Sequence, residues 1–290
     1  MESLLPSFLL SSSQPILAAG GIAAPELPLF GWLTNSILVA AVVTAGVLYF
    51  TRLATRNMTT IPGKKQNFVE FVIEFLYGQV EGIVGKQVAP KVFPLLATIF
   101  IFILASNWFG LLPGVGTIGF GETKAPLVLE TMETPLLRPA TADLNMTLAL
   151  AIVFMCVWAW ISVRELGVWG MVVHIFGPKG GLTGFLKYAL LPIFMFVGVI
   201  EIVSIVFRPM SLSLRLLGNI FAGETLLFTM GGLGETLGLN AFFSTIAAIA
   251  LPLPFYFMEI LVGLLQAVVF SLLCAVYIKL STAHDEGEHH

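Results

Sequence analysis

Charged residues are scarce in this sequence: only 11% of its 290 residues are Asp, Glu, Lys or Arg. Soluble globular domains carry about 25%, whereas hydrophobic residues here reach 57% and the mean hydropathy is +0.95. A chain so poor in charge cannot cover its surface with water-compatible groups, which excludes an ordinary soluble domain. The formal net charge of −3 also gives no indication of a nucleic-acid partner.

Cysteine is scarce too. The two cysteines, Cys156 and Cys274, both lie inside apolar stretches, where a free thiol behaves as a small apolar side chain. We therefore expect no disulfide framework, no metal site and no cofactor. A phosphate-binding P-loop sequence is absent as well, so we expect no nucleotide site and no catalytic site of the chain's own.

Long apolar runs are abundant instead. They reach about 20 residues or more, the length that a helix needs to cross a hydrocarbon core of about 30 Å. They are continuous and do not alternate in polarity, which excludes a transmembrane barrel. The sequence predicts an all-α polytopic membrane protein with spans at about 33–52, 94–112, 145–163, 190–230 and 241–278.

One segment, at about 66–85, has a different pattern. Glu70, Glu74 and Glu81 recur at helical spacing among aromatic and aliphatic residues, which predicts an amphipathic helix. Two interpretations fit this pattern: a helix lying at the membrane interface, or a helix packed on the membrane spans.

Basic residues are unevenly distributed between the loops. Six lie between Arg52 and Lys91, and only two lie in the loop 113–143. Basic residues favour the cytoplasmic side, and with Lys279 after the last run this asymmetry places the N-terminus outside and the C-terminus inside, which requires an odd number of crossings. The expected parts are an outer N-terminal arm at 1–32, a single membrane domain at 33–279 and a polar cytoplasmic tail at 280–290.

The fourth apolar run is too long for an upright span. Leu190 to Met230 covers 41 residues, which would extend about 60 Å as continuous helix. Either two short spans turn at Arg208-Pro209, or a single helix is strongly tilted; the odd number of crossings favours the single helix. The fifth run is also overlong, so the two are expected to form a tilted hairpin that turns at Gly231–Gly234.

Ionisable residues inside these runs are few and costly, since each costs at least about 2.5–3.5 kcal/mol at a helix centre. On a helical wheel of the fourth run, a polar stripe follows one side: Glu201, Ser204, Arg208, Ser211, Arg215, Asn219 and Ala222. A second stripe in the last run consists of Glu259, Gly263 and Gln266. Two such stripes facing each other would enclose a hydrated path.

Arginine at the centre of that path has a specific consequence. Arg215 stays protonated, so it cannot relay a proton but can act as a fixed cation. Other groups keep simpler interpretations open. Arg208 also fits a snorkelling or packing residue, Asp143 fits a cap of the third span, and Gln266 fits an interhelical hydrogen-bond partner.

The segment Ser211–Glu224, with the sequence SLSLRLLGNIFAGE, resembles a motif of F-type ATP synthase subunit a. The resemblance covers roughly residues 30–280. Further matching residues along the chain are Asn107 with Leu111-Leu112-Pro113, Asp143 with Asn145 and Thr147, Glu201 fourteen residues before Arg215, and Glu259 seven residues before Gln266.

The resemblance implies roles for these residues. Arg215 matches the family's essential arginine, which faces the carboxylates of a rotating c-ring and prevents protons from short-circuiting between two half-channels. Glu224 and Glu259 would line the outer half-channel and Glu201 the inner one. Some family members have a histidine where this chain has one of those two glutamates, which leaves the outer route open. The candidate proton-translocation residues are Arg215, Asn219, Glu224, Glu259, Gln266, Glu201 and Asp143.

The resemblance also implies partners and a location. The chain would be the stator subunit that couples proton flow to ATP synthesis, in contact with the c-ring, peripheral-stalk subunit b and lipid, and indirectly with the catalytic head. A bacterial inner membrane is expected, with proton or sodium left open. The alternative is a self-contained ion-coupled secondary transporter, which inverted repeats would favour. A structural scaffold would predict that neutralising Arg215 leaves transport intact.

Overall fold

The computed structural model describes residues 26–27, 30–112, 115, 119–125, 128–135, 137–176 and 191–282. Most of the predicted N-terminal arm and most of the polar tail lie outside these ranges.

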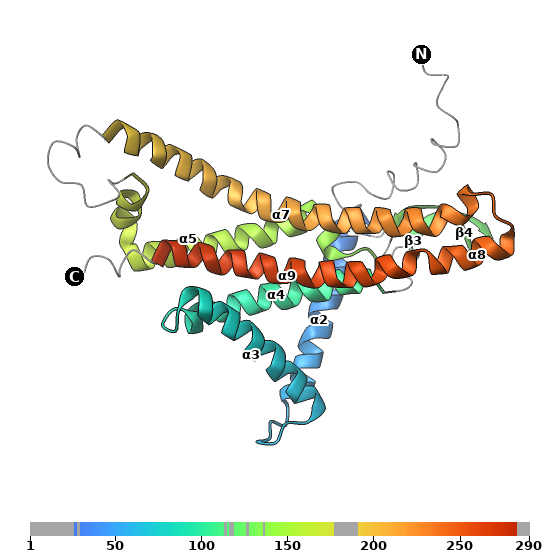
Figure 1. Ribbon diagram of the computed structural model, residues 1–290, viewed down its shortest axis with the longest axis horizontal. Coiled ribbons are helices and arrows are strands. Elements are labelled where there is room, and N and C mark those ends of the chain that lie inside the picture. The colour runs from blue at the N-terminus through green and yellow to red at the C-terminus, as the bar shows by residue number, and fades with distance from the viewer. Residues whose placement is uncertain are drawn as a thin grey trace, which may run out of the picture.

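Helices make up most of the described chain. Figure 1 shows most of them along the long axis of the molecule, with the helices at 35–55 and 64–84 extending to one side. Five are long and apolar enough to cross a membrane, which confirms the predicted fold class. The elements are α2 (Asn35–Thr55), α3 (Lys64–Val84), α4 (Ala89–Gly110), the 3-10 turn η1 (Ala140–Ala142), α5 (Leu144–Phe176), α7 (Leu191–Thr236), α8 (Ala241–Ala250) and α9 (Pro252–Thr282).

Two antiparallel hairpins accompany the helices and were not predicted. The first pairs β1 (Glu26–Leu27) with β2 (Phe30–Thr34), and the second pairs β3 (Gly119–Ala125) with β4 (Val128–Pro135). The second lies in the connection between α4 and α5, where β4 contains the β-branched residues Val128, Thr131 and Thr134. Neither hairpin interrupts an apolar helix.

The fourth apolar run is a single helix. α7 continues through Pro209, although a proline inside a helix removes one backbone hydrogen bond. The helix packs against α5 and α9, and in Figure 1 α7 and α9 run side by side along the bundle. This arrangement confirms the predicted hairpin of two long helices and excludes two short spans turning at Arg208-Pro209.

The hairpin turns later than expected. The prediction placed the turn at Gly231–Gly234, but α7 remains helical to Thr236, and Gly238 takes a positive φ of 68° in the actual turn. Gly234 instead allows α8 to approach closely: a Cβ there would lie 3.1 Å from Cα of Ser244. Gly234 therefore serves helix packing.

The third span is longer than predicted. α5 extends past 163 to Phe176, with a break at Gly167, where φ is 71°.

The amphipathic helix α3 packs on the bundle. It contacts α4 and α9, and Leu76 and Val80 are buried while Phe71 is exposed on its other side. The amphipathic helix therefore has one face on the bundle and a second, partly aromatic face outside it.

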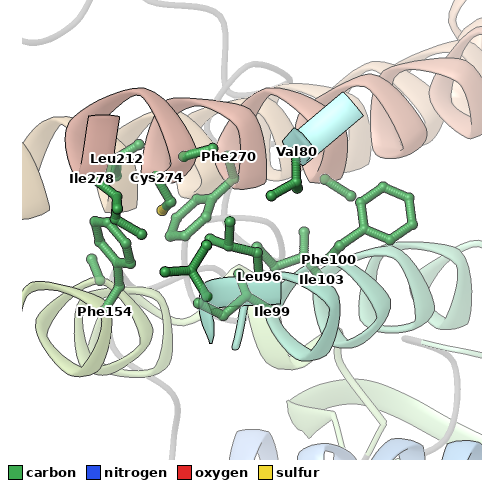
Figure 2. Packing of buried hydrophobic residues seen from close by; sticks show 14 of the residues in the cluster. Val80, Leu96, Ile99, Phe100, Ile103, Phe154, Leu212, Phe270, Cys274 and Ile278 are labelled. Carbon is green, nitrogen blue, oxygen red and sulfur yellow. The ribbon is translucent and has the colours of Figure 1, made fainter. Parts of the chain in front are cut away.

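The main hydrophobic core joins α3, α4, α5, α7 and α9. Figure 2 shows Leu96 and Ile99 of α4 packed near Phe270 and Cys274 of α9. Most of α7 contributes little to this core: its buried apolar side chains are Leu212, Leu216 and Ile220. The rest of α7 presents an apolar surface to its surroundings, as expected of a helix that faces lipid or another membrane protein.

Candidate functional site

The two long helices meet through a polar contact near the middle of α7. Asn219 Nδ2 donates a hydrogen bond of 2.7 Å to Oε1 of Gln266 on α9. Gln266 is buried, with 6% of its surface exposed. The predicted stripes of α7 and α9 therefore face each other at this level of the bundle.

A pocket with both polar and apolar lining residues lies beside this contact, between α4, α7, α9 and the segment before η1. Its volume is about 40 Å³, and roughly 10–15 Å³ is enough to hold one water molecule. The pocket can therefore hold water next to ionisable side chains. Its polar lining residues are Asn107, Asn219, Glu224, Glu259 and Gln266.

Glu224 and Glu259 approach each other across this pocket. They come from α7 and α9, and both line the pocket. The Glu259 carboxyl group lies directly against Gly223, where an added Cβ would overlap it. Gly223 therefore provides the space in which the carboxyl group of Glu259 lies beside α7.

Arg138 supplies a positive charge to the same site. It lies just before η1 with only 6% of its surface exposed. Its Nη2 lies 3.6 Å from Oε2 of Glu224. From the sequence, Arg138 was only one of two basic residues in its loop, and its contact with Glu224 was not predicted. The available signal was its position five residues before Asp143, in a loop with one other basic residue.

The third wall of the pocket comes from α4. Asn107 Nδ2 donates to the backbone oxygen of Gly263 at 3.2 Å, and Thr141 Oγ1 donates to Oδ1 of Asn107 at 2.9 Å. The neighbouring Trp108 Nε1 donates to the backbone oxygen of Ile260 at 3.2 Å. These bonds hold the part of α9 that carries Glu259 against α4.

Arg215 lies one helical turn before Asn219, but on the outside of the bundle. Its side chain is exposed, and within the described ranges it makes no hydrogen bond or ion pair. The large exposed side chains of this part of α7 are apolar: Phe207, Met210, Leu214 and Phe221. Ser211, one turn before Arg215, is also exposed. Arg215 is therefore a cation on a largely apolar surface of α7.

The N-terminal part of the predicted polar stripe of α7 does not reach the pocket. Arg208 Nη2 donates to Oε1 of Glu201 at 3.1 Å, and the guanidinium lies 4.6 Å from the ring centre of Tyr277 and 5.7 Å from that of Trp158. Trp158 Nε1 in turn donates to the backbone oxygen of Tyr277 at 3.0 Å. Glu201 and Arg208 therefore form a pair packed on α5 and α9, away from the pocket.

Asp143 does not line the pocket. Its Oδ1 accepts a hydrogen bond of 3.0 Å from the backbone nitrogen of Asn145, in the first turn of α5. The side chain is buried, with 4% of the residue surface exposed. This geometry agrees with the helix-cap interpretation.

Of the seven predicted site residues, four come together and three lie apart. Asn219, Glu224, Glu259 and Gln266 share the pocket, whereas Arg215 lies on the outer face of α7, Glu201 pairs with Arg208, and Asp143 caps α5. In the part of the chain that the structure describes, no three His, Cys, Asp or Glu side chains gather in the manner of a metal site.

Comparison with known proteins identifies one family. The family described as ATP synthase A chain matches residues 35–279. The chain is 34% identical to ATP synthase subunit a of Mycobacterium ulcerans over 257 residues, covering 88% of each protein. It is 32% identical to the subunit a of Protochlamydia amoebophila, covering 88% of this chain and 82% of the relative. For the subunit a of Mycobacterium leprae the identity is 32%, covering 96% and 99%.

Proposed function

The chain belongs to the ATP synthase A chain family, and on that premise we propose that it translocates protons as the stator subunit a of an F-type ATP synthase. In this role Arg215 is the fixed cation between two offset half-channels, and a rotating ring of c subunits carries protons from one to the other. Proton flow through the pair drives rotation, and so ATP synthesis by the catalytic head.

The position of Arg215 carries this proposal. A guanidinium on an apolar membrane face costs several kcal/mol unless a partner compensates it. The described chain provides no hydrogen bond or ion pair to Arg215, so the natural partner is an acidic side chain on a neighbouring membrane protein. A ring carboxylate that passes this face would be held ionised while it lies near the cation.

The outer half-channel is assigned to the pocket. Water in its volume of about 40 Å³ and the carboxylates of Glu224 and Glu259 provide groups that accept and release protons. Asn219 and Gln266 close the pocket on the side of Arg215. Asp143 contributes to this route indirectly, by fixing the start of α5 next to the segment that carries Arg138.

The inner half-channel is assigned to the side of Glu201. Glu201 lies on α7 fourteen residues before Arg215, which is about 21 Å along a helix, and its side chain is 32% exposed. Arg208 holds it from one side. This separation along α7 supports two paths that stop short of each other.

The proposed surroundings follow from the family and the charge distribution. Subunit b and lipid would cover other apolar faces of the bundle, and the arm at 1–32 would lie outside a bacterial inner membrane with the tail in the cytoplasm. All relatives described above are bacterial subunits a.

The test compares assembled complexes in inverted membrane vesicles with and without this chain. With the chain, ATP addition should acidify the vesicle lumen, and a protonophore should abolish the signal; without it, no acidification should occur. A self-contained transporter would behave differently. It would accumulate a solute in liposomes that contain this chain alone, and that result would replace the proposal.

A further inference from the structure

We propose that Arg138 is a positioning residue of the outer half-channel: it holds Glu224 as a fixed anion, so that Glu259 is the carboxyl group that carries the proton. This inference rests on the proposed function, and it gives different roles to two glutamates that the sequence alone leaves equivalent.

The first observation is an asymmetry between the two carboxyl groups. Glu224 has a cation beside it, since Arg138 Nη2 lies 3.6 Å from its Oε2. Glu259 makes no hydrogen bond or ion pair within the described ranges and lies against the bare backbone of Gly223. One carboxyl group is therefore charge-compensated, and the other is free to change its protonation state without breaking a contact.

The second observation is the closeness of the two groups. Both line the same small pocket, so two negative charges there would repel each other. When only one of two adjacent carboxyl groups has a cation beside it, that group ionises more readily than its neighbour, because the opposite charge favours the ionised form. The charge of Arg138 thus assigns the ionised state to Glu224 and the proton to Glu259.

The third observation concerns how firmly Arg138 is held. Its side chain is only 7% exposed, and the segment that follows it packs under α2 and α7 through η1. A buried arginine cannot lose its proton, so it acts as a constant charge. Removing a close partner of a buried charge is costly because the remaining charge is left uncompensated.

The resulting transfer is balanced in protons and charge. A hydronium ion that enters the pocket gives its proton to the Glu259 carboxylate and is left as neutral water, and Glu259 passes that proton to an ionised carboxylate of the ring. Glu259, ionised again, takes the next proton from another hydronium ion, while Glu224 and Arg138 keep their charges throughout. In the reverse direction the same groups act in the opposite order.

The experiment uses the assembled complex in inverted vesicles, at matched amounts of this chain. We compare Arg138→Gln, Arg138→Lys, Glu224→Gln, Glu259→Gln and the double variant Arg138→Gln/Glu224→Gln. ATP-driven acidification should fall at least about tenfold in Arg138→Gln, the scale expected for breaking a close charge pair. It should recover in Arg138→Lys, which keeps the charge, and in the double variant, which removes both charges together.

The comparison of the two glutamates gives a second, independent outcome. Glu259→Gln should lose more pumping than Glu224→Gln, even if Arg138→Gln fails to assemble. The proposal is overturned if Glu224→Gln is the more damaging change, or if the double variant is no better than Arg138→Gln. Arg215→Ala in the same series separates the two proposals. If Arg215→Ala still pumps normally, the proposed channel function is wrong. If Arg215→Ala no longer pumps, an unexpected result for the other variants contradicts only the roles given to Arg138 and the two glutamates.

Discussion

Asn219 on α7 donates a 2.7 Å hydrogen bond to Gln266 on α9, one helical turn beyond Arg215. This bond ties together the two long helices next to the one exposed guanidinium of the proposed path. It fixes the rotation of α7 about its axis at that level, and therefore the direction in which Arg215 projects.

Breaking that bond should lower coupling without preventing assembly. Interhelical hydrogen bonds in membranes contribute about 0.6 kcal/mol on average and up to about 1.7, so Gln266→Leu should reduce ATP-driven pumping severalfold while the chain remains in the complex. Asn219→Leu should have a similar effect, and the double variant should be no worse than either single change. Additive losses would show that the two amides act separately.

Gly223 should not tolerate a side chain. An added Cβ would overlap the carboxyl group of Glu259, so Gly223→Ala should displace Glu259 and reduce pumping at unchanged levels of assembled complex. Gly232→Ala is the matched control, because nothing lies within 4 Å of a Cβ at that position of the same helix. Equal pumping by the two variants would contradict the close contact.

The pair of Arg208 and Glu201 should act mainly on stability. The Arg208 guanidinium bonds to Glu201 and lies 4.6 Å from the ring centre of Tyr277, and a desolvated cation–π contact contributes about 2 kcal/mol. Arg208→Met should therefore lower the temperature at which the purified complex releases this chain. Arg208→Lys should lie between the parent and Arg208→Met, because lysine keeps the charge but lacks the planar group. A lysine variant no more stable than Arg208→Met would rule out the charge as the cause.

Asparagine at position 143 should keep the cap of α5. Asp143 Oδ1 accepts the backbone N–H of Asn145, and an asparagine side chain provides the same acceptor. Asp143→Asn should therefore be more stable than Asp143→Ala, which loses the cap and should destabilise the chain by about 1 kcal/mol. Thermal release of the chain from the complex measures both variants. Equal destabilisation by the two changes would contradict the capping role.

The sequence predicts the helices well because their signal is local. Five apolar runs indicate five membrane helices, and the length of the run at 190–230 indicates the single long α7. The turn was misplaced because glycine serves either a turn or a close approach of helices. Only the packing of α8 on Gly234 distinguishes the two. The β3–β4 hairpin was missed because, among the described residues, its strands pair with each other and with no further strand.

The candidate site was predictable only in part. Helical spacing placed Asn219 and Gln266 on facing stripes, which the hydrogen bond between them agrees with. The same stripe could not show that Arg208 turns to Tyr277 while Arg215 stays exposed, since a wheel ignores side-chain direction and neighbours. Arg138 was missed because its partner Glu224 lies 86 residues away along the chain, so the pair appears only after folding.

The central claim concerns Arg215, and the most direct measurement compares two proton fluxes in the same vesicles for the parent and Arg215→Ala. One is ATP-driven acidification, and the other is passive proton leak after the catalytic head has been removed. The account predicts that Arg215→Ala abolishes driven pumping while passive conduction is retained or increased, because the cation that separates the half-channels is gone. Unchanged driven pumping at equal assembly would contradict it.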